Sequence, residues 1–243
     1  MTNQHLPIRL MNCPIVDALL EVRFTSNLNR SAVFGYIYSL LQNSYPGPVF
    51  NLPLSQIPDA IREKDPNLQF KPIYRIDGIE TVLQIGPDVI TLSSKLPYIG
   101  WDKLESQAIE IISQLKDKGA IDKVLRFGHR YINFFEGCID ERLNLYVNFV
   151  DGYSAQNIQI RSEVSDGLFT NTLQYSNSAE YRPTDLSVVK KGSIIDIDTF
   201  RIYSGDYFLN NIKEEINTAH VSEKKLFYSL LKSDFINELN PEY

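Results

Sequence analysis

The chain has 243 residues, of which 43% are hydrophobic and 22% charged, the balance of an ordinary globular protein rather than a disordered one. Its net charge of −6 argues against a general nucleic-acid-binding surface, which is normally basic. Cys13 and Cys138 are too few for a disulfide framework, and neither a secretion signal nor a transmembrane stretch is found. We therefore expect a cytoplasmic protein with reduced thiols and no membrane contact.

The first predicted elements are a strand and a helix. Residues 14–24 read PIVDALLEVRF, in which every second residue is apolar and forms one face of a strand. On the opposite face, Asp17 and Glu21 are roughly 13 Å apart, too far for a directly coupled carboxylate pair. The helix that follows is predicted to have Asn29 as its N-cap and to end before Pro46.

Residues 46–67 contain five prolines and are predicted to form a loop with one short helix near 55–64. Long loops are uncommon in compact domains and often functional, so this one is either a lid or partner-binding segment or an ordinary surface loop. An antiparallel meander is predicted next, with strands at 68–76, 79–85 and 89–94. A long helix at 101–118, which Gly119 ends, follows the meander.

The longest run of strand-forming residues is 122–136, DKVLRFGHRYINFFE. Alternation places His129 and Tyr131 on one face of this strand and Arg126 and Arg130 on the other. Both faces are otherwise largely apolar, so we expect a central strand that is covered on both sides. Gly128, within the same run, indicates a bulge or a close backbone approach.

Charged residues in such a strand need an explanation, because an unpaired buried charge is strongly unfavourable. One interpretation is structural, with each arginine paired to an acid on a neighbouring strand. We predict specifically that residues 14–24 and 122–136 are neighbouring strands and that Glu21 pairs with Arg130. The other interpretation is a ligand or partner site formed by Arg126, His129, Arg130 and Tyr131.

The rest of the chain continues the alternation of strands and helices. Residues 139–150 fit a helix and a strand about equally well. A hairpin is predicted over 156–176 with its turn at Asp166-Gly167, followed by a polar excursion over 178–192 and a strand over 193–203. Two helices close the chain, one over 207–218 and one capped by Ser222.

Each half of the chain thus reads as a strand, a helix or helix-like link, three strands and a long helix. The pattern predicts an α+β fold with an internal duplication, in which 14–119 and 120–243 are the two α+β halves of one pseudo-duplicated domain. We expect either two antiparallel sheets or one continuous sheet, with long helices packed on one face.

Three short motifs carry a resemblance to a known family: PIVDALLEVRF at 14–24, FGHRYINFF in the middle, and IIDIDTFR with LFYSLL near the end. The chain resembles a sporadically distributed prokaryotic family without an assigned activity, whose members show a PIVEALLEIRF-like start and a GLRYIN-like middle motif. His129 departs from that pattern, where an apolar residue is typical. The family's patchy distribution implies horizontally moved genes such as defence or toxin-related loci, and it implies no catalytic residues.

Motifs for catalysis or cofactor binding are not found. The sequence has no glycine-rich phosphate loop, no dinucleotide-binding fingerprint, no GxSxG and no local metal-binding spacing among its histidines. Asp196 and Asp198 are the one carboxylate pair at metal-like spacing, and a solvated sheet face explains them better than a metal-dependent hydrolase. We therefore expect no catalytic residues, no metal and no cofactor.

Without a catalytic constellation, we expect a non-catalytic recognition protein that binds a protein partner. It would be an accessory, antitoxin-like or immunity-like component of a defence locus, with its partner encoded nearby. The alternative is a small-molecule or nucleotide-binding domain with an anion pocket near Arg126, His129 and Arg130. The oligomeric state stays open at this point.

Overall fold

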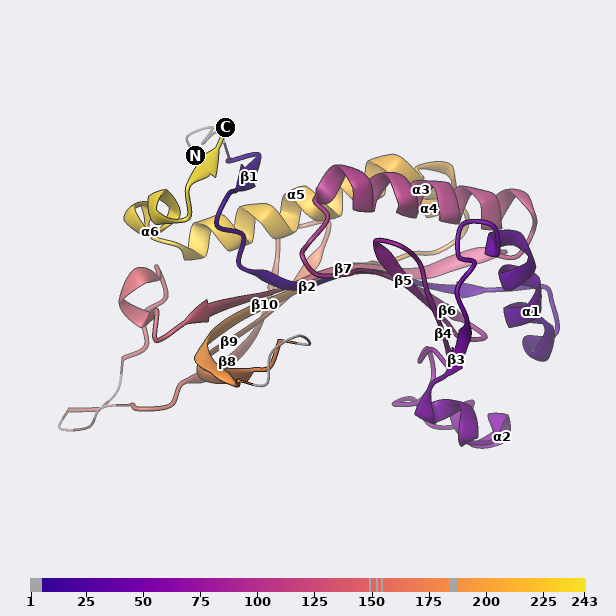
Figure 1. Cartoon of the computed structure of the whole chain (residues 1–243), viewed down its shortest axis with the longest axis horizontal. Coiled ribbons are helices and arrows are strands. Elements are labelled where there is room, and N and C mark those ends of the chain that lie inside the picture. Colours follow the sequence, from indigo (N-terminus) through magenta and orange to yellow (C-terminus); the bar gives the residue numbers. More distant parts are fainter. Residues whose placement is uncertain (1–5, 149, 152, 154, 184–187) are drawn as a thin grey trace. The chain divides into compact units, whose positions relative to one another are not determined.

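The protein has an α+β fold, and the computed structural model describes residues 6–148, 150–151, 153, 155–183 and 188–243 (Figure 1). Within these residues, nine strands form a mostly antiparallel sheet in the order β3-β4-β5-β6-β2-β7-β10-β9-β8, and β1 pairs with β11 in a second sheet. The elements in chain order are β1 (Arg9–Leu10), β2 (Ile15–Thr25), α1 (Arg30–Leu41), β3 (Val49–Asn51), the 3-10 helix η1 (Pro53–Gln56), α2 (Asp59–Arg62), β4 (Tyr74–Asp77), β5 (Thr81–Ile85), β6 (Val89–Ser94), α3 (Trp101–Asp117), β7 (Lys123–Glu136), the 3-10 helix η2 (Asp140–Arg142), β8 (Gln159–Ser165), β9 (Thr170–Tyr181), β10 (Lys190–Ile202), α4 (Tyr207–Asn210), α5 (Ile212–Leu230), α6 (Ser233–Glu238) and β11 (Pro241–Glu242).

The chain divides into two compact units, each assembled from separate stretches of sequence. Unit 1 consists of Met1–Val16, Arg130–Thr199 and His220–Tyr243, and unit 2 consists of Asp17–His129 and Phe200–Ala219. The two units therefore interleave along the chain, whereas the predicted halves follow one another. The internal duplication stays a prediction.

In unit 2, the core lies between α3 and the strands β2, β5 and β6. Buried residues of α3 recur every three or four positions, which gives the helix one apolar face. Gly119 ends the helix with a φ of +70°, as predicted, because glycine adopts this conformation at low cost. The buried residues that line a small internal space in this core are Leu20, Val22, Leu83, Ile90, Leu92, Ala108, Ile111 and Ile112.

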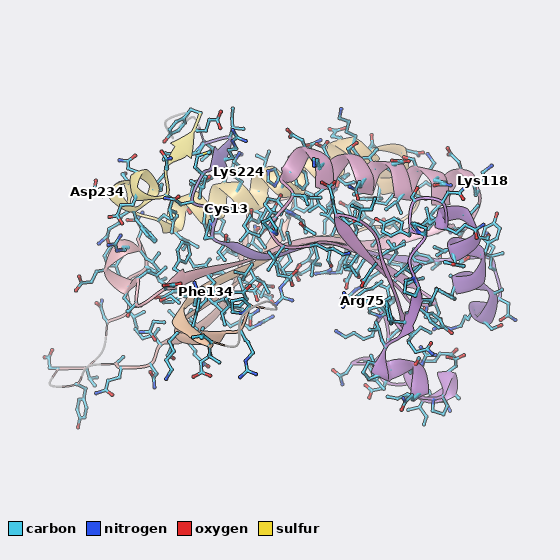
Figure 2. All side chains as sticks on the ribbon, in the orientation of Figure 1. Cys13, Arg75, Lys118, Phe134, Lys224 and Asp234 are labelled. Atoms are coloured by element: carbon cyan, nitrogen blue, oxygen red, sulfur yellow. The ribbon has the colours of Figure 1, made fainter. Side chains whose placement is uncertain are left out.

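In unit 1, the core is formed by strands β9 and β10, the C-terminal half of α5, and α6. At the end of β7, Phe134, labelled in Figure 2, packs against Tyr181 with ring centroids 5.1 Å apart. β1 joins this unit through its pairing with β11, where the Ile8 amide donates to the Glu242 carbonyl over 2.6 Å. The buried core residues include Leu173, Tyr175, Ile195, Ile197, Phe227, Tyr228, Leu231 and Phe235.

Most predicted elements of the first 136 residues are confirmed, with corrections in the proline-rich region. Segment 46–67 contains η1, the expected short helix α2, and the short strand β3, which pairs with β4. The strand predicted at 68–76 begins only at Tyr74, because Phe70 has a φ of +58° and interrupts the extended chain.

The prediction for 139–150 is wrong for both alternatives. The described residues contain η2 and then no regular element, because Leu143 is buried in the core of unit 1 while Tyr146, Val147 and Val150 face solvent. Their apolar spacing therefore does not mark one buried face.

Two further predictions near the C-terminus are corrected. The excursion 178–192 is shorter than expected, since β9 extends to Tyr181 and β10 begins at Lys190, and 184–187 lie outside the described residues. α5 runs without a break through Ser222, whose hydroxyl accepts a hydrogen bond from the Asn171 side chain over 3.2 Å instead of capping a new helix. Among the described helices, none has the length and apolar character needed to cross a membrane.

Candidate functional site

Arg126 is held in an ionic pair within unit 2. β2 and β7 are neighbours in the sheet, as predicted, and the Asp122 amide donates to the Thr25 carbonyl over 2.8 Å at the end of this pairing. The resulting antiparallel register places Arg126 beside Glu21, and Arg126 Nη1 donates a hydrogen bond to Glu21 Oε1 over 2.8 Å. The guanidinium also lies 4.4 Å from the ring centroid of Phe200, a favourable cation–π distance.

Arg130 has the same kind of environment in unit 1. Its Nε and Nη2 donate to the two carboxylate oxygens of Asp196 over 2.7 and 2.5 Å, a bidentate geometry. Gln174 donates to the same carboxylate over 3.1 Å. The Asp196 side chain is 9% exposed, so both of its oxygens are occupied where water has little access.

The prediction that Glu21 pairs with Arg130 is therefore corrected. The structure pairs Glu21 with Arg126 and with Arg23, whose Nε donates over 2.7 Å, and it pairs Arg130 with Asp196. The neighbouring strands were predicted correctly, but the register was shifted by four residues, which is roughly 13 Å along a strand.

His129 and Tyr131 lie on the opposite face of β7. His129 is fully buried in unit 2 with its ring 5.1 Å from that of Trp101, and burial lowers its pKa to about 3, so the ring is neutral at physiological pH. Tyr131 is buried in unit 1, edge-on to His220. The four candidate residues thus belong to two faces and two units, and both guanidiniums have carboxylate partners. This arrangement gives little support to an anion pocket.

Two places within unit 1 carry carboxylates that could take part in holding a metal. Asp196, half of the predicted carboxylate pair, is engaged with Arg130, which makes a metal there less favourable. On α5, His220 and Glu223 are one turn apart and their ligand atoms lie within 4.8 Å of each other. Glu223 Oε1 is buried without a hydrogen-bond partner, and burial raises the pKa of this carboxyl to about 8. No sequence pattern indicates this pair, because its burial is a tertiary property.

Unit 1 also contains an apolar surface, formed by the described residues of segment 144–157 between η2 and β8. Tyr146 is 78% exposed, Tyr153 is 73% exposed and Val150 is 66% exposed. Its described residues form no helix or strand. Such side chains usually enter a core or a partner interface, because burying them is favourable.

Both ends of segment 144–157 are fixed to the core of unit 1. At its start, the Asn144 amide donates to the Leu230 carbonyl over 2.7 Å, and the Asn144 side chain donates to the Leu231 carbonyl over 3.1 Å. Just past its end, the Ile158 amide donates to the side chain of Asn177 over 2.9 Å. The segment is therefore a loop presented by a packed scaffold, the usual arrangement of binding loops.

Comparison with known proteins identifies no family. No protein-family model matches the chain, and no curated protein matches it significantly. The family resemblance of the three sequence motifs stays a prediction.

Proposed function

We propose that the protein is a non-catalytic recognition protein that binds a protein partner through segment 144–157. The observation that carries the proposal is the exposure of Tyr146, Val150 and Tyr153 on a loop whose two ends are anchored. A partner that covers these side chains would remove apolar surface from water, which is the main driving force of association.

The composition of the segment supports the same function. NLYVNFVDGYSAQN combines tyrosine and phenylalanine with asparagine, serine and glycine, and Asp151 is its one charged residue. Tyrosine offers a large contact area at a low cost in conformational entropy, and small polar residues adapt their hydrogen bonds to a partner. Such a surface recognises a protein better than it recognises a highly charged ligand.

The partner is proposed to be the product of a neighbouring gene, as for antitoxin-like or immunity-like components of defence loci. The test is co-expression of the chain with each neighbouring gene, followed by size-exclusion chromatography. The chain and one neighbour should elute together. Replacing Tyr146 and Tyr153 by Ser should raise the Kd of that complex by about 10- to 100-fold, since central aromatic residues dominate interface energies.

A matched control is Tyr243→Ser, which removes another exposed tyrosine of unit 1 and should leave the complex intact. Circular dichroism spectra of all variants should agree, because the three side chains are exposed. Co-elution that survives the double substitution unchanged would refute the role of the segment. If no neighbouring product co-elutes with the chain, the proposed function itself fails.

A further inference from the structure

β8 is a terminal strand of the nine-stranded sheet and pairs with β9 along one side. On its other side, no strand pairs with it within the described residues. All of its residues except Ile160 are exposed. An exposed edge of this kind presents backbone donors and acceptors that a further strand can use.

Hydrogen bonds at the two ends of the β8–β9 ladder show which backbone groups are available. The Asn177 amide donates to the Ile158 carbonyl, and the Asp166 amide donates to the Phe169 carbonyl, both over 3.2 Å. Hydrogen-bonded pairs alternate along an antiparallel ladder, so the even-numbered residues from 158 to 166 bond to β9. The amides and carbonyls of the odd-numbered residues 159, 161, 163 and 165 therefore point away from β9.

The sequence of β8, QIRSEVS, is complementary to itself about Ser162. If a second copy of β8 lies antiparallel with Ser162 opposite Ser162, Arg161 lies opposite Glu163 of that copy and Ile160 lies opposite its Val164. Opposite charges and apolar side chains in directly opposed positions each stabilise a strand pair. Within one chain, Arg161 already donates to Glu163 over 2.9 Å, so the two side chains share a face.

The backbone hydrogen-bonding pattern of β8 favours the same register as its side-chain pairs do. With Ser162 on a twofold axis, the hydrogen-bonded pairs join residue 161 to 163 and residue 159 to 165, which are the residues whose backbone groups point outward. On the other face, Ile160 packs against the core of unit 1, and Val164 of the second copy would extend that apolar surface. Charged residues on an edge strand normally prevent pairing, but here the paired charges would attract.

We propose that the protein forms a homodimer in which β8 pairs with β8 of a second copy in this antiparallel, twofold-symmetric register. The interface is isologous, so it closes after two copies and leaves no further edge at β8. The strand residues that form it, 159–165, do not include Tyr146 or Tyr153, and the Tyr146→Ser/Tyr153→Ser variant should remain a dimer.

Charge exchange tests the register by sedimentation equilibrium. Arg161→Glu and Glu163→Arg each place like charges opposite one another in the homodimer and should each raise its Kd about tenfold or more. Mixing the two variant chains pairs every glutamate with an arginine, so the mixture should dimerise again. The side chains are 62% and 52% exposed, so both variants should keep the thermal stability of the parent within a few degrees.

Cross-linking tests the position of the twofold axis. Opposed residues of a pair that is not hydrogen-bonded have Cα atoms about 4.5 Å apart, within the range that a disulfide spans. In a background with Cys13→Ser and Cys138→Ser, Ser162→Cys should form a disulfide-linked dimer on mild oxidation, whereas Ser165→Cys should not. A parent chain that sediments as a monomer at all accessible concentrations, or a variant mixture that does not associate, would overturn the proposal. Equal cross-linking at both cysteine positions would overturn the register.

Discussion

Gly128→Ala should destabilise unit 2 by pushing Arg126 away from Glu21. A Cβ atom at position 128 would lie 2.4 Å from Arg126 Nη1, so the guanidinium must move by about 1 Å to reach an ordinary contact distance. Gly128 is not among the glycines with positive φ, so the backbone itself accepts alanine. The cost therefore comes from the displaced side chain.

The magnitude follows from what the guanidinium loses. Arg126 and Glu21 have side chains 13% and 19% exposed, and their hydrogen bond is 2.8 Å long. A shielded hydrogen bond between charged groups contributes about 1.5–3 kcal/mol. Because the guanidinium is the far end of a flexible side chain that can shift, this amount is the upper bound of the loss in unfolding free energy for Gly128→Ala. Urea denaturation of the parent and the variant measures the difference.

A double-mutant cycle identifies Arg126 as the obstacle. An Arg126→Ala background removes the three atoms that would lie nearest to a Cβ at position 128, so Gly128→Ala should there change the free energy of unfolding by less than about 0.5 kcal/mol. An equal loss in both backgrounds would show that alanine at position 128 disturbs something other than the arginine, and the guanidinium would then not be the reason for a glycine at this position.

Arg130→Met should cost about 3 kcal/mol of unfolding free energy because it leaves the buried Asp196 carboxylate without a cation, although Gln174 still donates to it. Arg130→Met/Asp196→Leu should cost less, and a double variant less stable than the single one would contradict this. Gly192→Ala should cost more than about 3 kcal/mol, because its Cβ would lie 2.0 Å from a backbone carbonyl oxygen of β7, and a melting temperature close to that of the parent would contradict it. For Asp140, burial alone would raise the pKa, but hydrogen bonds from Tyr175 and other donors hold the pKa below its ordinary value. The ionised Asp140 therefore stabilises the folded protein above pH about 4, and this contribution is lost as the pH falls through the folded pKa. The stability difference between parent and Tyr175→Phe should accordingly shrink in acid urea titrations, and a difference that is constant with pH would exclude Asp140 as its source.

The strands and helices with regular apolar spacing were predictable from the sequence. β2 alternates cleanly, β7 is a long run of strand-forming residues, and α3 shows one apolar stripe ended by Gly119, so local patterns and the glycine were sufficient. Ser222 misled the prediction because serine is a good N-cap, and its actual partner, Asn171, is distant in sequence.

The candidate sites were less predictable, because register and burial are tertiary properties. The sequence indicated that the arginines of β7 need carboxylates, but both Glu21 and Asp196 fit that requirement, and alternation alone does not choose between them. Segment 144–157 had a visible signal in its tyrosines and asparagines, but the apolar spacing of Leu143, Val147 and Val150 favoured a buried element instead. In the structure only Leu143 of these three residues enters the core, and Val147 and Val150 are exposed.

The interleaving of the two units has a consequence for biosynthesis. During translation, residues 17–129 leave the ribosome as one block that contains most of unit 2, so these residues can collapse early. Unit 1 cannot be completed at that stage. β1 pairs with β11, which is synthesised much later, and the core residues of β9 and β10 are covered by α5, which also follows them in the sequence. The nascent chain therefore carries the apolar faces of unit 1 uncovered until residues 220–243 have been made, and in that interval it depends most on chaperones. Premature termination before residue 220 would leave that surface permanently open.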